Sequence, residues 1–263
     1  MIAPRYLSAE QELWNKKWGA PFGYAHAQAI GSMESIPPTQ RFRLAGPFAF
    51  QANNTTRYFE YPWVYSQIDH NLSRDIIDVG AGLTGMQFVL SKLGHRLYCV
   101  DPGLADRDAY GWGSTKISHE DLNAAFHTDV KPFAVRLEET GFTEGSIDYV
   151  TCVSTIEHIP ADGAKALLAT AARMLKPGGR FVATIDLFLN LEPWTRKTSN
   201  KWGTNLNVYE LTQAAPQLEL VVGDRSQLYG FPEFDPEKIM EDLELYYLGE
   251  YPCFAQCLVL EKR

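Results

Sequence analysis

The sequence predicts an α/β protein built on a mostly parallel, doubly wound sheet. From residue 75 onward, short apolar runs of strand length alternate with segments whose apolar residues recur at helical spacing. Strands that are apolar on both faces are typical of a parallel sheet covered by helices on both sides. The chain has 263 residues, 45% hydrophobic and 21% charged, which is enough for one compact domain with appendages.

The first 70 residues differ in pattern from the remainder. They are rich in aromatic residues but follow no long period, and Gly, Pro and Asn–Asn interrupt them. We expect a helix near 8–18, a second helix near 60–70 and irregular segments around them. The predicted organisation is an N-terminal extension over residues 1–70 that covers a main domain over residues 71–263.

Local signals place the elements of the main domain. A Gly-rich turn ends the first strand, Gly94 ends the first helix, and Lys176-Pro177-Gly178-Gly179 stops the helix before the fifth strand. The last strand follows a long loop instead of a crossover helix, so we expect it to be antiparallel. The expected strands are 75–79, 96–101, 132–136, 147–153, 180–185, 218–222 and 253–260, and the expected helices are 84–93, 118–128, 162–175 and 206–214.

The charge and cysteine content exclude several classes of protein. The 24 Lys and Arg residues against 32 Asp and Glu residues give a formal net charge of −8, which argues against binding nucleic acid. No apolar run approaches the roughly 20 residues that span a bilayer, and the polar N-terminus lacks an apolar signal core. The four cysteines do not form a disulfide framework in a chain of this length, so we expect a cytoplasmic protein without membrane partners.

A glycine-rich turn and a later aspartate predict a nucleoside site. Gly80-Ala81-Gly82-Leu83-Thr84-Gly85 joins the first strand to the first helix, where glycines permit a tight turn close to a ligand. Asp101 ends the second strand, where a carboxylate can accept both ribose hydroxyls. Asp78 would repel a pyrophosphate but suits an ammonium or sulfonium ligand, or braces the loop. The turn alone also fits dinucleotide binding.

Five segments together resemble the motifs of class I S-adenosylmethionine-dependent methyltransferases. They are Asp78-Val79-Gly80-Ala81-Gly82, Val100-Asp101, the stretch from Arg136 to Asp148, Val153-Ser154-Thr155-Ile156-Glu157-His158-Ile159, and Leu175-Lys176-Pro177-Gly178-Gly179. The resemblance implies a seven-stranded sheet with an antiparallel last strand. It also implies S-adenosyl-L-methionine as methyl donor and S-adenosyl-L-homocysteine as product. The cofactor-binding residues that it indicates are Tyr61, Asp78, Gly80, Ala81, Gly82, Asp101, Pro102, Arg136, Leu137 and Ser154.

The third-strand loop departs from the family pattern. Related enzymes usually have an acid there that contacts the adenine amine, whereas this chain has Arg136. Asp129 is an alternative acid, but it lies 19 residues before Asp148, which exceeds the usual spacing. We therefore expect Leu137 to pack on the adenine face and its backbone N–H to donate to the ring.

The segment after the fourth strand carries the candidate catalytic residues. Methyl transfer is an in-line displacement, in which positioning alone can lower the barrier by roughly 7–11 kcal/mol. His158 is the candidate general base, and the competing interpretation is a structural imidazole hydrogen-bonded within the sheet. Glu157 either orients His158 or lines the pocket. Some related enzymes bind a divalent cation through Glu-x-x-Glu-His here, but Ser154 replaces the first Glu, so we predict no metal.

Two segments are expected to cover the active site and contact the acceptor. One is the N-terminal extension, with Trp14 and Trp18, and the other is a lid over about 186–206, with Trp194 and Trp202. Aromatic and basic residues suit a planar or sugar-like anion, although the same aromatics can simply fasten the lid. We expect methylation of a small molecule at oxygen or nitrogen, while the sequence assigns no oligomeric state. The alternatives are a non-catalytic cofactor-binding subunit and a nicotinamide-dependent oxidoreductase.

Overall fold

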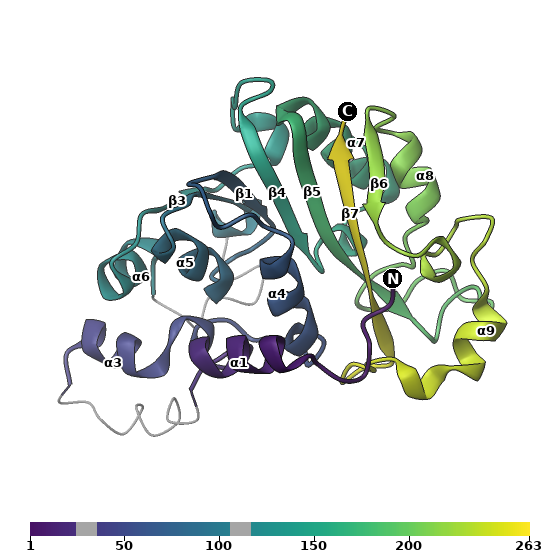
Figure 1. Ribbon diagram of the computed structural model, residues 1–263, viewed down its shortest axis with the longest axis horizontal. Coiled ribbons are helices and arrows are strands. Elements are labelled where there is room, and N and C mark those ends of the chain that lie inside the picture. Colours follow the sequence, from purple (N-terminus) through teal and green to yellow (C-terminus); the bar gives the residue numbers. More distant parts are fainter. Residues whose placement is uncertain (25–35, 106–116) are drawn as a thin grey trace. The chain divides into compact units, whose positions relative to one another are not determined.

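The computed structural model describes residues 1–24, 36–105 and 117–263, which form two compact units (Figure 1). One unit comprises Ser8–Thr140 and is called here the cofactor unit. The other comprises Met1–Leu7 and Gly141–Arg263 and is called the acceptor unit. In the described residues, no helix is long and apolar enough to cross a membrane.

The cofactor unit contains a three-stranded parallel array with helices. Its strands are β1 (Asp75–Val79), β2 (Arg96–Val100) and β3 (Val130–Phe133), with β2 pairing in parallel with both others. The helices are α1 (Ala9–Trp18), α3 (Pro38–Ala45), α4 (Arg57–Ser66), α5 (Gly85–Lys92) and α6 (His119–Phe126). The expected helix near 8–18 is confirmed. A capping box between Ser8 and Gln11 begins it, and Gly19 ends it in the left-handed conformation.

Two predicted elements of this unit have the wrong bounds. The third strand was expected over 132–136 but spans Val130–Phe133, because Val130 is buried and pairs with Leu97. Pro132 lies in β3 at the end of the strand order, where a missing N–H costs no ladder bond. The helix expected near 60–70 spans Arg57–Ser66, and the His70 ring bonds the carbonyl of Tyr65 near its end.

The acceptor unit contains the second part of the predicted α/β pattern. Its strands are β4 (Ile147–Val153), β5 (Leu175–Phe188), β6 (Leu218–Val222) and β7 (Cys253–Lys262). β4 and β5 are parallel, and β7 is antiparallel to both β5 and β6, so the predicted antiparallel closing strand is confirmed. The helices are α7 (Ala161–Met174), α8 (Val208–Gln213) and α9 (Pro236–Glu241).

β5 is longer than the predicted strand over 180–185. Leu175 already pairs with Ile147, and a register shift between Ile147 and Tyr149 accommodates the Lys176–Gly179 segment. At the other end, pairing with β7 continues to Phe188, opposite Cys253. The longer strand carries Asp186 to its carboxyl end, where the candidate functional residues lie.

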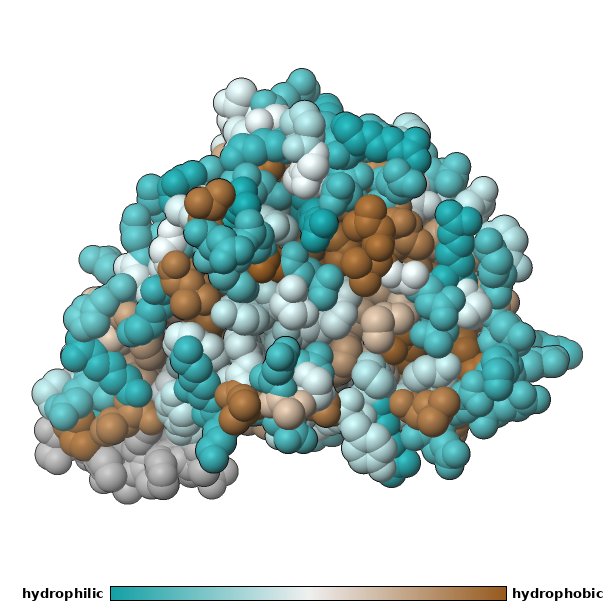
Figure 2. All heavy atoms as spheres, in the orientation of Figure 1, coloured by the Kyte–Doolittle hydropathy of each residue, from teal (hydrophilic) through white to brown (hydrophobic). Residues whose placement is uncertain are grey.

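The strand order β3-β2-β1-β4-β5-β7-β6 confirms the predicted fold class. It is a doubly wound, seven-stranded α/β sheet with one antiparallel strand. All four cysteines are buried and none of them forms a disulfide. The face in Figure 2 is mostly hydrophilic, with apolar residues in separate groups, as expected for a chain whose apolar residues fill the core.

Candidate functional site

The glycine turn after β1 has a backbone that only small residues allow. Gly80 and Gly82 have φ values of 67° and 55°, in the left-handed region where a side chain is strained. The Gly80 N–H donates to the carbonyl of Val100 at 2.9 Å, which ties the turn to the end of β2. Ala81 is buried between them. The turn therefore has the tight backbone that its glycines predict, and close approach of a ligand to it stays a prediction.

Asp101 organises this turn from the end of β2. Its side chain is 4% exposed and accepts the Gly82 N–H at 2.9 Å and the Gly103 N–H at 2.8 Å, one on each oxygen. Burial raises the pKa of this carboxyl, while the two backbone N–H groups act in the opposite direction. Pro102 is exposed and begins the short turn Pro102–Leu104. Each carboxylate oxygen keeps a further lone pair, so the group fits the two vicinal hydroxyls of a ribose.

Tyr61 and Asp78 are also buried in the cofactor unit. Tyr61 is 2% exposed, donates its hydroxyl hydrogen to Asn53 Oδ1 at 2.6 Å, and accepts one from Thr84 Oγ1 at 3.0 Å. Burial is the main cause that raises the pKa of the Tyr61 phenol. Asp78 lies within β1 and is 2% exposed. The Thr84 bond connects Tyr61 directly to the residue that precedes α5.

Two glutamines that the sequence analysis did not single out also hold the turn. Gln87 is fully buried on α5 and donates its amide hydrogen to the Gly82 carbonyl at 3.0 Å. His119 Nε2 lies 3.1 Å from the Gln87 side-chain oxygen. Gln51 accepts the Leu83 N–H at 2.7 Å. Gln87 carries a sequence signal, since a buried amide in the first helical turns after a glycine loop needs a backbone partner.

Arg136 and Leu137 follow β3 in a short turn. Arg136 is exposed, and its backbone N–H donates to Glu139 Oε2 at 2.9 Å. Leu137 begins the 3₁₀ turn Leu137–Glu139 and is 2% exposed. Asp129 is exposed on the loop before β3. The contact of Leu137 with an adenine remains a prediction.

Ser154 lies after β4 in a strained conformation. Its φ is 41°, in the left-handed region that non-glycine residues rarely adopt, and its N–H donates to the Thr184 carbonyl at 2.9 Å. The side chain is 6% exposed, and among the described residues no protein group hydrogen-bonds its hydroxyl. A strained backbone and a buried hydroxyl with an unused hydrogen bond are both typical of a ligand-binding residue.

His158 has a defined tautomer. The ring is exposed, and its Nδ1 hydrogen-bonds the backbone carbonyl of Trp202. Because a carbonyl can only accept, Nδ1 carries the hydrogen, and the lone pair of neutral His158 lies on Nε2. Glu157, 1% exposed, accepts the Asp186 N–H at 2.9 Å and therefore helps to fix the end of β5. That Glu157 orients His158 stays a prediction.

An aromatic stack lies beside these residues in the acceptor unit. The Trp202 and Tyr251 rings are stacked with centroids 4.6 Å apart, and Phe188 stacks on Tyr251 at 5.8 Å. The Tyr251 hydroxyl donates to Asp186 Oδ2 at 2.8 Å. The Lys201 ammonium lies 4.3 Å from the Trp202 ring centroid. The sequence analysis singled out Trp202 but not Tyr251, which comes from a segment about 50 residues later.

Other predicted aromatics fasten the structure. Trp194 packs edge-on against Phe254 at 6.4 Å, and its indole N–H donates to the Pro236 carbonyl at 3.2 Å. Trp14 is buried and contacts Phe48 and Tyr65 in the cofactor unit. These two tryptophans therefore hold surface segments to the core.

The predicted site residues divide between the two units. Those of the cofactor unit are Tyr61, Asp78, Gly80, Ala81, Gly82, Asp101, Pro102, Arg136 and Leu137. Those of the acceptor unit are Ser154, Glu157 and His158. Over the described parts of the chain, no three His, Cys, Asp or Glu side chains gather as a metal site. Within the cofactor unit, Gly80 and Gly82, which lack Cβ atoms, and the Asp101 carboxylate fit a nucleoside cofactor.

The fold is a doubly wound α/β sheet, and the glycine turn bonded to Asp101 lies at the carboxyl end of its first strand, where open α/β sheets commonly bind ligands. A family model described as "Methyltransferase domain" matches residues 77–183, from β1 into β5. A search of curated proteins found no match to the sequence. The chain therefore contains a methyltransferase domain over residues 77–183, and its sheet has the strand order of the class I S-adenosylmethionine-dependent methyltransferases. S-adenosylmethionine is the cofactor that this assignment indicates.

Solved structures of other methyltransferases are similar to this chain. An S-adenosylmethionine-dependent methyltransferase from Mesorhizobium loti has 12% identity and a TM-score of 0.50, over 77% of this chain and 97% of that one. Geranyl diphosphate C-methyltransferase from Streptomyces coelicolor A3(2) has 14% identity and a TM-score of 0.49, over 99% and 100%. The 1,6-didemethyltoxoflavin-N1-methyltransferase from Burkholderia thailandensis has 18% identity and a TM-score of 0.47, over 99% and 94%. We transfer no acceptor atom from these proteins to this chain.

Proposed function

We propose that this methyltransferase transfers a methyl group to an oxygen or nitrogen of a small-molecule acceptor, with His158 as general base. The tautomer of His158 carries the proposal, because its Nε2 lone pair is available to the proton of an acceptor hydroxyl or amine. The acidic net charge of −8 supports a small molecule over a nucleic acid.

The proposed reaction balances without a further reactant. The acceptor oxygen or nitrogen forms a bond to the methyl carbon while the methyl–sulfur bond breaks. The electron pair of the broken bond stays on sulfur. The acceptor proton passes to His158 Nε2. The cofactor supplies the electrophilic methyl group, while the residues of the chain bind, align and deprotonate.

Each part of the cofactor is proposed to contact particular residues. Asp101 accepts the ribose hydroxyls, Leu137 packs against the adenine, and the glycine turn admits the rest of the nucleoside. Tyr61 and Asp78 contact the methionyl end, where Asp78 suits the ammonium or sulfonium charge. Pro102, Arg136 and Ser154 complete the contacts. The buried Asp101 carboxylate and the strained Ser154 support these assignments.

The acceptor half of the proposal rests on the aromatic stack. Trp202 and Tyr251 offer flat apolar faces, and Lys201 adds a positive charge to the Trp202 ring. A planar acceptor with an anionic group matches this surface. The N-terminal extension over residues 1–70 is proposed to cover the active site, together with the lid over about 186–206.

The experiment begins by finding the acceptor. Whole-cell extracts are incubated with the enzyme and methyl-labelled S-adenosylmethionine, and mass spectrometry of the small-molecule, protein and nucleic-acid fractions detects the labelled product. Label on a small molecule at oxygen or nitrogen is the expected result. Label recovered only in protein or nucleic acid would contradict the small-molecule assignment, and label on carbon would contradict the acceptor atom.

His158→Ala and His158→Gln then test the base. Loss of a general base lowers kcat by about 100-fold or more and removes the corresponding limb of the pH–rate profile. The affinity for S-adenosylhomocysteine should stay unchanged. A kcat and pH profile like those of the unmodified enzyme would assign His158 the structural role instead.

A further inference from the structure

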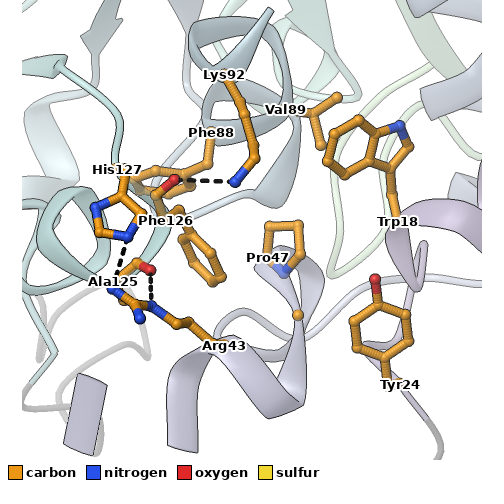
Figure 3. Close-up of a pocket in the computed structure, with 11 residues that line it drawn as sticks. Trp18, Tyr24, Arg43, Pro47, Phe88, Val89, Lys92, Ala125, Phe126 and His127 are labelled. Atoms are coloured by element: carbon orange, nitrogen blue, oxygen red, sulfur yellow. Dashed lines mark hydrogen bonds between the residues drawn. The ribbon is translucent and has the colours of Figure 1, made fainter. Parts of the chain in front are cut away.

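A separate cavity lies within the cofactor unit (Figure 3). Its volume is about 330 Å³, at the lower end of the range for small-molecule sites. It is lined by side chains of α1, α3, α5 and α6 and by the segments that follow them. From α5 it takes Phe88, Val89 and Lys92 in the second part of the helix, whereas the glycine turn precedes the first residue of α5. None of the residues proposed to bind the cofactor lines it.

Flat aromatic side chains form much of the wall. Figure 3 shows Trp18 and Tyr24 on one side of the cavity and Phe126 on the other, with Pro47 between them. Trp18 and Tyr24 are half-buried, while Phe126 is 8% exposed. Walls of this kind suit a planar apolar group, because ring faces give large contact area with little loss of rotamer freedom.

The ionisable basic side chains of the lining are Arg43, Lys92 and His127, and no acidic residue lines the cavity within the described chain. This concentration is opposite to the net charge of −8 for the whole chain. Arg43 Nε donates to the Ala125 carbonyl at 2.7 Å, and Lys92 Nζ donates to the Phe126 carbonyl at 3.3 Å. Both contacts are to neutral oxygens, so among the described residues neither charge is matched by a carboxylate there.

His127 hydrogen-bonds the Arg43 guanidinium from a strained backbone conformation. It ends α6 with a φ of 56°, a left-handed position that favours glycine or asparagine. Its Nε2 lies 2.7 Å from Arg43 Nη2 and accepts a hydrogen bond from it. Together with the Ala125 contact, this bond fixes the guanidinium plane and leaves Nη1 available to a ligand.

We infer that this cavity is a binding site for a small aromatic carboxylate. The ring system lies between Trp18 and Phe126, and the carboxylate bonds the Arg43 guanidinium and the Lys92 ammonium. The match is one of charge and of shape, since a planar anion satisfies both the basic groups and the aromatic walls. The site is distinct from cofactor binding and from methyl transfer, and it does not depend on the proposed acceptor.

Calorimetric titration with 2-naphthoate tests the inference. The full chain is first saturated with S-adenosylhomocysteine, and 2-naphthamide serves as a neutral probe of the same shape. We expect saturable binding of 2-naphthoate at one site and binding of the amide weaker by about tenfold or more, because charged hydrogen bonds are lost. Equal affinities for the two probes, or no saturable binding of 2-naphthoate to the S-adenosylhomocysteine-saturated chain, would overturn the inference.

Substitutions of the lining residues test whether 2-naphthoate binds in this cavity. Arg43→Gln and Lys92→Gln should each weaken 2-naphthoate binding by about tenfold. The matched control is Lys16→Gln, which removes an exposed charge of α1 outside the lining and should leave the affinity unchanged. His127→Gly suits the left-handed backbone, so it should keep the fold and weaken binding through loss of the Arg43 contact and of the His127 ring from the cavity wall. An equal loss in the Lys16 variant would show a general charge effect and contradict the site.

Discussion

The two units hold their functional residues by different means. In the cofactor unit, Asp101, Gln87 and Tyr61 are buried and joined by hydrogen bonds to the glycine turn or to the residue before α5. In the acceptor unit, His158 is exposed and bonds the carbonyl of Trp202, whose half-buried ring stacks on the half-buried ring of Tyr251. A closed network fixes one backbone shape for one cofactor, whereas an open aromatic surface can change with the acceptor. The difference predicts that substitutions in the two units separate cofactor affinity from acceptor affinity.

Asp101→Ala should give the largest effect on the cofactor side. It removes the proposed acceptor of the ribose hydroxyls and leaves the Gly82 and Gly103 N–H groups without their partner. We expect S-adenosylhomocysteine to bind about 100-fold more weakly, from the loss of charged hydrogen bonds. Isothermal titration measures this affinity. Asp129→Ala is the control and should bind normally; weakening in that variant instead would assign the acid to Asp129.

Asp101 should also make the affinity for S-adenosylhomocysteine depend on pH. Because burial raises the pKa of Asp101, the carboxylate takes up its proton at a higher pH than an ordinary aspartate. S-adenosylhomocysteine affinity should therefore begin to fall on acidification before ordinary aspartates titrate. Titrations between pH 7 and pH 4 check this, and Asp101→Asn should lose the dependence. An affinity that is constant over the range would contradict the role of the carboxylate.

Trp202→Ala should affect the acceptor side alone. Loss of the stacked ring removes a face from the acceptor surface, and we expect the acceptor KM to rise by about tenfold. The S-adenosylhomocysteine affinity should not change. Trp194→Ala is the matched control, because Trp194 packs on Phe254 and should lower the unfolding midpoint without a specific rise in KM. If Trp202→Ala weakens cofactor binding as strongly as acceptor binding, the predicted separation of the two affinities between the units is wrong.

Two substitutions of Ser154 separate the effect of its backbone strain on stability from the effect of its hydroxyl on S-adenosylhomocysteine binding. Ser154→Gly relieves the left-handed φ, whereas Ser154→Ala keeps it. The glycine variant should have a free energy of unfolding higher than the alanine variant by about 1 kcal/mol. Both lack the hydroxyl and should bind S-adenosylhomocysteine several-fold more weakly. Equal stability of the two variants in denaturant titrations would show that the position is not strained.

The smallest effect concerns the pH dependence of stability in the cofactor unit. His70 Nε2 donates to the Tyr65 carbonyl at 3.0 Å, and its Nδ1 accepts from His95 Nε2 at 2.9 Å, so the folded state uses neutral His70. Burial lowers the pKa of His70, which means that the unfolded chain binds more protons in the window just below the ordinary histidine value. The contribution to stability is present above about pH 6.5 and is lost as pH falls toward the lowered pKa. His70→Gln should reduce this acid-side slope in thermal unfolding, and an unchanged slope would contradict the assignment.

The sequence predicts the cofactor unit better than the acceptor unit, for a physical reason. The bounds of β1 agree with prediction because an apolar run ends at Gly80, whose backbone conformation only glycine adopts readily. Asp101 follows from its place after β2. Gln51 and Tyr251 could not be predicted, since their contacts depend on how distant segments fold back. The bounds of β3 were wrong because pairing with β2, and not local apolarity, decides where that strand starts.

Titration of the purified chain with S-adenosylhomocysteine and, separately, with NADH tests the central claim most directly. Saturable binding of the sulfur nucleoside at one site, which Asp101→Ala weakens and Asp129→Ala does not, is the predicted result. Saturable binding of NADH with no heat from S-adenosylhomocysteine would contradict the assignment of the glycine turn and Asp101 to this cofactor.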